Sequence, residues 1–194
     1  LVVISPTAST NKLDDKDDFF LRVNPPDRTE TDHLARQAYE AMGLRHIAVI
    51  YDLSNRSFSE GVYLNFKSAF DEYGNGAVTG VTFTSGPQVD FIGITRQAIL
   101  SDTGAGVDGI LIVAEAVDAA LICQQIKKHI EDIPIFATGW AMTQRLIEHG
   151  GRTVEGVIFS HYFDQHSQKE SYRWFQERYA DRFGAPPDFI AGLG

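Results

Sequence analysis

The stretch VDGILIVAE, residues 107–115, decides the fold. Its apolar residues run from Ile110 to Ala114 without alternation, which is typical of a strand buried on both faces of a parallel sheet. A strand covered on only one face would alternate apolar and polar residues. The run ends at a charged residue, Glu115. Because ligands of open α/β sheets bind outside the carboxyl ends of the strands, the same stretch predicts both an architecture and a place for a site.

The chain around this stretch alternates single strands with single helices. Apolar runs predict further strands at 46–51, 78–84, 133–137 and 154–160, and a short helix is expected at 141–149. Strands that are joined by single helices and short loops form βαβ units with right-handed crossovers. We therefore predict the α/β class, a three-layer doubly wound parallel sheet, with pieces of a second, incomplete lobe.

Two segments that change the chain direction set the predicted domain boundaries. The first is the double proline Pro25-Pro26, which can continue neither the hydrogen bonding of a sheet nor a helix. The second follows the last predicted strand, where the regular alternation of strands and helices ends. Residues 25–160 are predicted to form one α/β lobe, and residues 1–24 and 161–194 to be parts of another. Since the chain opens on a strand and stops without a finishing element, we expect a piece of a longer protein.

Composition excludes several classes of function. The net charge of −9 and the pI of about 5.0 argue against a nucleic-acid partner or an anionic membrane surface. Cys123 is the only cysteine, so neither an internal disulfide nor a cysteine metal cluster is possible. No apolar run approaches the roughly 20 residues of a membrane helix.

Sequence signatures of catalysis are also missing. The chain has no GxGxxG or GxxxxGK[ST] phosphate loop and no GxSxG nucleophile turn. Its histidines form no HxH or HxxxH pair with a carboxylate at metal spacing, although His161, Asp164 and His166 lie near one another in a segment that is more typical of a solvated joint. We predict that the protein is not an enzyme and needs no cofactor or metal.

Three local patterns, in this order, carry a resemblance to a known family. ISPTASTN at 4–11 precedes FLRVNPPD at 20–27, IAVIYD at 47–52 leads to FSEG at 58–61, and VEGV at 154–157 precedes a long helix closed by YADRFG at 179–184, Pro187 and Asp188. With these patterns the chain resembles the periplasmic amino-acid-binding proteins of the Leu/Ile/Val type, the type I solute-binding or Venus flytrap family of extracellular ligand-binding receptors. The resemblance covers nearly the whole chain but only the middle and C-terminal part of that family's fold.

The resemblance implies a set of ligand-binding residues. Ala8, Ser9 and Thr10 match the segment that holds the ligand carboxylate through hydroxyls and backbone amides, a role that suits an anion-binding turn; an ordinary turn is the alternative. Phe58 matches an aromatic residue that closes over the ligand, or else packs at a helix start. Trp140 falls near the position of an acid that pairs with the ligand's ammonium group, so Glu115 would have to take that role. As aromatic residues, Phe58 and Trp140 equally suit an apolar or aromatic carboxylate, and Trp140 as core filler stays an alternative.

The function that the resemblance implies is solute capture for an ABC transporter. Two lobes would close on a small carboxylate-bearing ligand, such as a branched-chain or other amino acid, and deliver it to membrane permease subunits. The alternative is a ligand-sensing extracellular domain of a receptor or regulator with the same fold, for an amide or an aromatic or aliphatic acid. A periplasmic or extracellular location follows from either function. Self-association is expected if the incomplete lobe, residues 1–24 and 161–194, leaves surface uncovered.

Overall fold

The computed structural model describes most of the chain and divides it into two compact units. One unit comprises residues 1–26 and 161–194, and the other comprises residues 27–160. Asn11 and Asp188, which belong to motifs quoted above, lie outside the described residues. The described residues are 1–10, 13, 16–100, 106–161, 164, 166–187 and 191–193.

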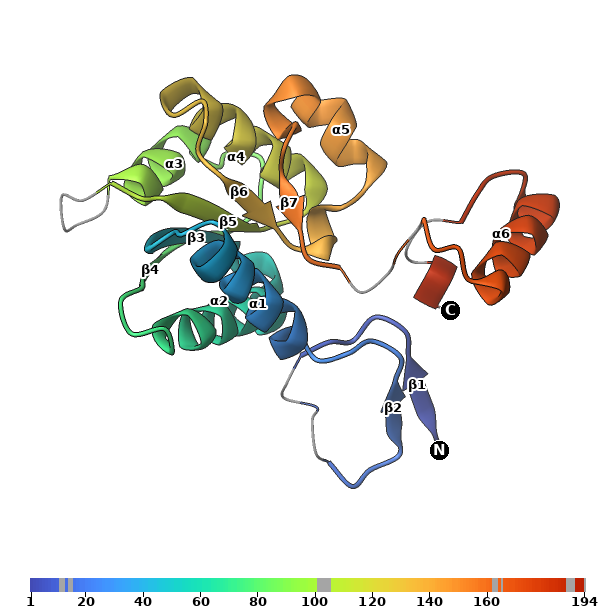
Figure 1. Cartoon of the computed structure of the whole chain (residues 1–194). Coiled ribbons are helices and arrows are strands. Elements are labelled where there is room, and N and C mark those ends of the chain that lie inside the picture. The colour runs from blue at the N-terminus through green and yellow to red at the C-terminus, as the bar shows by residue number, and fades with distance from the viewer. Residues whose placement is uncertain are drawn as a thin grey trace. The chain divides into compact units, whose positions relative to one another are not determined.

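The larger unit is built on a five-stranded parallel sheet with the strand order β4-β3-β5-β6-β7 (Figure 1). Every strand pair in it is parallel, so the prediction of a parallel α/β sheet is confirmed. The opening stretch supplies the central strand β5, and all five of its residues are buried. The strands are β3 (His46–Asp52), β4 (Ala77–Phe83), β5 (Gly109–Val113), β6 (Ile135–Ala137) and β7 (Ile158–Phe159).

Alternate residues of β3 and β5 enter two separate cores, one on each face of the sheet. Ile47, Val49 and Leu111 pack with α1 (Asp27–Arg36) and α2 (Arg56–Asp71). The residues next to them in sequence, such as Ala48, Ile50 and Ile110, pack on the other face. The other helices of this unit cover that face: α3 (Phe91–Ile99), α4 (Ala116–His129) and α5 (Gln144–Gly150). Figure 1 shows these helices on the two sides of the sheet, and the doubly wound three-layer prediction is therefore confirmed.

Gly109 permits the close pairing of β5 with β3. A Cβ atom at this position would lie 2.9 Å from Cδ1 of Ile47 and 3.0 Å from Cδ1 of Leu44. Both atoms are the ends of side chains, so a larger residue at 109 would require Ile47 and Leu44 to repack. The glycine in the opening stretch thus has a packing role.

Two predicted elements differ from those observed. The strand expected at 154–160 is reduced to β7, because Gly156 has a φ of +80° and the preceding residues form a 3₁₀ turn, η5 (Gly151–Val154). The helix expected from Ala141 begins only at Gln144, since Met142 and Thr143 have non-helical backbone. Residues before it form the 3₁₀ turn η4 (Gly139–Ala141), which carries Trp140. Other short helical elements are the π-helix η2 (Gln37–Ala41) after α1, η3 (Leu53–Asn55) after β3, and η6 (Ala191–Leu193).

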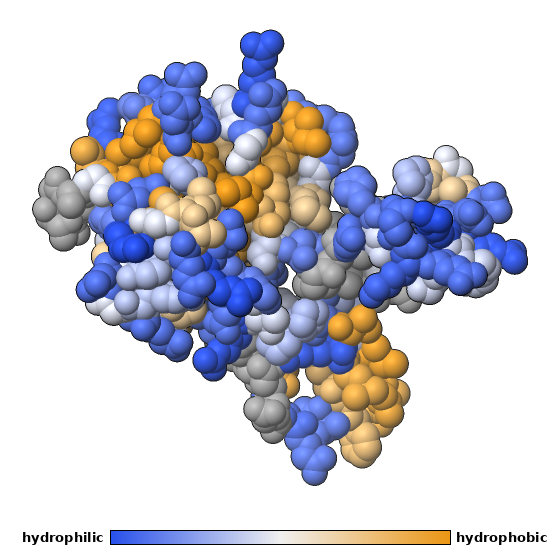
Figure 2. All heavy atoms as spheres, viewed as in Figure 1, coloured by the Kyte–Doolittle hydropathy of each residue, from blue (hydrophilic) through white to orange (hydrophobic). Residues whose placement is uncertain are grey.

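The smaller unit contains a two-stranded parallel sheet and one long helix. The strands are β1 (Val3–Ser5) and β2 (Phe20–Arg22), and the helix is α6 (Glu170–Phe183). Seven large apolar side chains in and beside the two strands are exposed, and Figure 2 shows the resulting orange patch. None of the described helices is long and apolar enough to cross a membrane. The exposed apolar residues are Leu1, Val2, Val3, Ile4, Phe19, Leu21 and Val23.

The single cysteine gives a direct test of the larger unit's core. Cys123 of α4 is 1% exposed, and burial raises the pKa of its thiol to about 12. Because the thiolate is the reactive form, native protein should react with a thiol reagent such as DTNB far more slowly than unfolded protein. Rapid, stoichiometric labelling without denaturant would show that α4 does not pack against the sheet as described.

Candidate functional site

The pairing of β3 with both β4 and β5 creates a topological switch point. The chain passes from β3 to β4 on one side and reaches β5 on the other. In open α/β sheets, ligands bind at such a point, outside the carboxyl ends of the strands. Asp52 is the last residue of β3, and Glu115 follows β5 by two residues. The sequence rule that singled out Glu115 and the observed topology thus indicate the same edge of the sheet.

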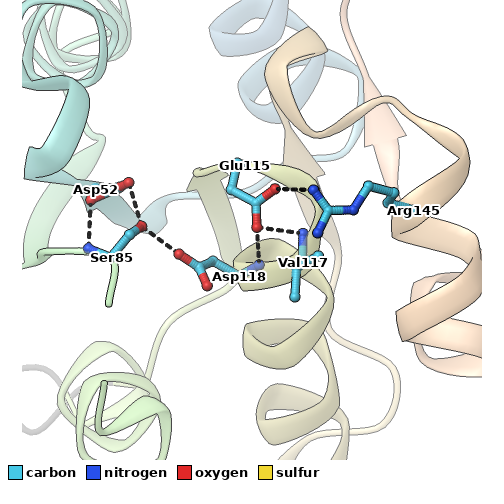
Figure 3. A network of polar contacts seen from close by, with 6 residues as sticks. All are labelled: Asp52, Ser85, Glu115, Val117, Asp118 and Arg145. Carbon is cyan, nitrogen blue, oxygen red and sulfur yellow. Dashed lines mark hydrogen bonds and ion pairs between the residues drawn. The ribbon is translucent and has the colours of Figure 1, made fainter. Parts of the chain in front are cut away.

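Glu115 is held in place by the start of α4 (Figure 3). It is the N-cap residue of this helix, and its Oε1 accepts hydrogen bonds from the backbone N–H groups of Val117 and Asp118 at 2.9 and 3.1 Å. Its Oε2 lies 3.8 Å from Nη1 of Arg145 on α5. The two capping bonds fix the orientation of the carboxylate group. Oε1 therefore caps the helix, while Oε2 faces the guanidinium of Arg145 beyond hydrogen-bond distance.

Phe58 and Trp140 are brought into contact at the same edge of the sheet. Their ring centroids lie 5.6 Å apart and their planes are 88° apart, an edge-to-face arrangement that aromatic rings prefer. Phe58 lies in α2 after β3, and Trp140 lies in η4 after β6. The strand that leads to Glu115, β5, lies between β3 and β6 in the sheet. The aromatic pair therefore joins the two segments that follow the strands on either side of β5. Both rings are half-buried.

A network of oxygen atoms that the sequence analysis did not predict joins β3, β4 and α4 at this edge. The buried Asp52 carboxylate accepts from the amides of Ser54 and Ser85 at 2.8 and 3.0 Å, and from both of their hydroxyl groups. The Ser85 hydroxyl also makes a short contact with Oδ2 of Asp118 (Figure 3). Each of these residues ends a strand or follows one within five residues, so the carboxyl-end rule could have found them. Nothing local in the sequence marks Arg145.

Ser85 lies between two carboxyl groups whose pKa values shift in opposite directions. Oγ of Ser85 lies 2.6 Å from Oδ2 of Asp52 and also contacts Asp118, but a hydroxyl group donates only one proton. Burial raises the pKa of Asp118, as do the nearby Glu115 and Asp52, although the Ser85 contact opposes the rise. Burial would also raise the pKa of Asp52, but the bonds from Ser54 and Ser85 together lower it. Asp118 is thus the carboxyl group whose pKa is raised at this edge, and Asp52 is the one whose pKa is lowered.

Glu30, on the first turn of α1, contacts the turn that carries Trp140. Its side chain accepts a hydrogen bond from the backbone amide of Gly139, and its Oε1 is buried with no hydrogen-bond partner among the described residues. Burial raises the pKa of Glu30 to about 7, the Gly139 amide opposes this rise, and Asp27 adds to it. Glu30 is therefore a half-buried acid that contacts η4 and titrates near neutral pH.

In the smaller unit, the Ala8-Ser9-Thr10 segment follows β1 as a half-buried loop. The Ala8 amide donates to Oγ of Ser5 at 3.1 Å, and the Thr10 carbonyl accepts from Nη1 of Arg22 at 2.9 Å. These bonds fix the loop backbone from both ends. The loop lies at a strand's carboxyl end, as Glu115 does in the larger unit. Its ligand-binding role stays a prediction.

Among the described residues, no group of three or more histidine, cysteine, aspartate or glutamate side chains is arranged to hold a metal ion. The carboxylates of Asp52, Glu115 and Asp118 bond instead to serines and to helix amides. The chemistry that this edge offers is thus hydrogen bonding and charge pairing beside an aromatic surface.

A doubly wound lobe with such an edge is the architecture of a ligand-binding protein. The sequence matches the family model described as periplasmic binding protein over residues 1–194, and the chain belongs to that family. The resemblance on which the sequence analysis relied is therefore confirmed. Among curated proteins, none matches the chain.

Solved structures of solute-binding proteins share the fold. A leucine-binding protein, LivK, from Thermotoga maritima is 28% identical with a TM-score of 0.86, and the match covers 99% of this chain and 53% of that one. The substrate-binding protein LivJ from Streptococcus pneumoniae, solved with isoleucine, is 16% identical with a TM-score of 0.81, covering 100% and 53%. A substrate-binding protein from Desulfitobacterium hafniense in complex with Leu is 20% identical with a TM-score of 0.73, covering 100% and 53%. The chain spans about half the length of these proteins.

The two aspartates of the network should respond differently to neutral replacement. Asp118→Asn keeps a donor toward Ser85, whereas Asp52→Asn places an NH₂ group among donors. We expect Asp52→Asn to lower the free energy of unfolding by about 1–3 kcal/mol, the cost of losing bonds to a buried charge, and Asp118→Asn to cost clearly less. Urea denaturation of both variants measures the difference. An equal or larger cost at Asp118 would show that the bonds to Asp52 are not the main contribution of this network to stability.

Glu30 should make the stability of the protein depend on pH. Because its folded pKa of about 7 exceeds the ordinary value of 4.5, the folded state binds the proton more tightly, and stability is lost as pH rises through this range. Glu30→Gln, which is always neutral, should be more stable than the wild type by about 1–3 kcal/mol at about pH 8, with the difference vanishing toward about pH 4. Urea denaturation across pH tests this, with the exposed Glu148→Gln as the control; a pH-independent difference would exclude the assignment.

Proposed function

We propose that this chain is part of the solute-binding component of an ABC importer, which captures a small carboxylate-bearing ligand, a branched-chain or other amino acid, in a cleft between two lobes. The observation that carries the proposal is the Glu115 carboxylate. It is fixed at the switch point of the sheet by two helix amides, and its second oxygen remains available to a ligand. A fixed anion of this kind suits the ammonium group of an amino acid.

The surroundings of Glu115 support an amphipathic ligand. The Phe58–Trp140 pair offers aromatic surface to an apolar side chain. Both residues are half-buried, so a ligand that covered them would remove their remaining exposed surface from water. In the other unit, the backbone-anchored Ala8–Thr10 loop offers amides and hydroxyls to a ligand carboxylate.

The printed descriptions of the relatives favour amino acids as ligands. LivK is described as a leucine-binding protein, LivJ was solved with isoleucine, and the Desulfitobacterium protein was solved with Leu. Transfer to this chain is a proposal, since their identity is 16–28% and this chain spans about half their length. The proposal includes membrane permease subunits as partners, a periplasmic or extracellular location, and binding without catalysis.

Ligand titration of the full-length protein tests the proposal. Leucine, isoleucine, valine and phenylalanine would be compared by thermal shift with their desamino analogues, such as 4-methylpentanoate for leucine. We expect at least one amino acid to stabilise the protein, by about 2.7 kcal/mol when its concentration is about 100 times Kd. Glu115→Gln should weaken binding of that amino acid about tenfold or more, because a hydrogen bond to a charged group is lost, and should weaken the desamino analogue far less.

The control variant for this titration is Glu148→Gln, which removes the same charge from an exposed position on α5. The glutamine at 115 can still accept from the α4 amides, so the helix cap is preserved. If no member of the panel stabilises the protein, amino-acid capture is wrong. If Glu115→Gln weakens the binding of the amino acid and of its desamino analogue equally, Glu115 does not bind the ammonium group.

A further inference from the structure

The contact between Arg145 and Glu115 has the features of an interaction that a ligand can replace. Nη1 of Arg145 lies 3.8 Å from Oε2 of Glu115, beyond hydrogen-bond distance, and the Arg145 side chain is 63% exposed. An exposed ion pair of this kind contributes about 0–1 kcal/mol. Arg145 also lies in the first turn of α5, where the helix dipole disfavours a cation. Little free energy therefore holds the guanidinium in place.

The two oxygens of Glu115 differ sharply in how firmly they are bound. Oε1 accepts two backbone hydrogen bonds within hydrogen-bond distance, and these bonds orient the whole carboxylate. Among the residues that the structure describes, Arg145 is the one that contacts Oε2, and the contact is long (Figure 3). A cationic group that approached Oε2 to about 2.8 Å would form a charge-assisted hydrogen bond, the stronger interaction, without any reorientation of Glu115.

We propose that Arg145 is an affinity- and specificity-determining residue that competes with the ligand's ammonium group for Oε2 of Glu115. With the site empty, Arg145 compensates the charge of Glu115; ammonium binding releases Arg145 toward solvent. This inference rests on the proposed function and adds to it a competitor within the protein. It also explains how the three carboxyl groups at this edge can remain close together in the empty site, since Arg145 offsets part of their negative charge.

Competition from Arg145 should affect the affinity of some ligands and not of others. A ligand with a primary ammonium group can take over Oε2, whereas a plain carboxylate gains nothing from the release of Arg145. Arg145 therefore lowers the affinity for amino acids and leaves that for desamino analogues nearly unchanged. Because an exposed pair is screened by salt, the effect of Arg145 should decrease as ionic strength rises.

The test measures leucine and 4-methylpentanoate binding to the full-length protein by calorimetry, in the wild type and in Arg145→Gln. We expect Arg145→Gln to raise leucine affinity by up to about fivefold at low salt, the factor that corresponds to an exposed ion pair, and to leave 4-methylpentanoate within about twofold. In a Glu115→Gln background the same replacement should have no effect on leucine. Arg152→Gln, which removes an exposed arginine of η5, is the matched charge control.

A decrease in leucine affinity in Arg145→Gln would overturn the proposal, because Arg145 would then be a direct ligand contact for the carboxylate. An unchanged affinity, or an equal increase in the Glu115→Gln background or in Arg152→Gln, would overturn it as well. These results leave amino-acid capture itself intact, so the two proposals can fail separately.

A second measurement needs no amino acid. Methylammonium should shift the NMR signals of the Glu115 carboxyl carbon and of the Arg145 guanidinium in wild-type protein, whereas tetramethylammonium, which has no N–H donor, should shift them much less. If the amino-acid panel fails and methylammonium produces these shifts, the exchangeable pair is real and the proposed function is wrong. If methylammonium and tetramethylammonium act alike, Arg145 is not displaced by an ammonium group.

Discussion

The parallel pairing of β3 with β5 is the constraint on which the rest of the structure depends. Because both strands are buried on both faces, their backbone polar groups bond within the sheet and their side chains supply both apolar cores. Polar side chains can then leave the sheet only at the strand ends. As all strands are parallel, Asp52, Phe58, Glu115 and Trp140 follow strands at one edge. The position of the candidate site is a consequence of the fold.

The sequence was sufficient for the fold class and for part of the site, for identifiable reasons. An uninterrupted apolar run at 110–114 reports burial directly, and residues that follow strands reach the carboxyl edge whatever their distance in the sequence. The strand expected at 154–160 was too long, because a pattern of apolar residues does not show that Gly156 has a positive φ. Contacts between distant segments, such as Arg145 with Glu115 or Glu30 with Gly139, depend on helix placement and had no local signal.

The edge combines carboxyl groups that are distinguished by their hydrogen bonds. Serine donors lower the pKa of Asp52, whereas burial and the neighbouring carboxylates raise the pKa of Asp118. The carboxylate of Glu115 is oriented by helix amides that bind one of its oxygens. The first two acids thus join β3, β4 and α4, whereas Glu115 caps α4 and faces Arg145.

The central claim is that Glu115 binds the ammonium group of an amino acid beside the aromatic pair. The most direct measurement is a crystal structure of the full-length protein with bound leucine. The account predicts that the leucine nitrogen lies about 2.7–3.2 Å from Oε2 of Glu115, with Arg145 displaced and the capping bonds of Oε1 intact. A leucine whose nitrogen is bound by other groups, with Arg145 still facing Glu115, would contradict it.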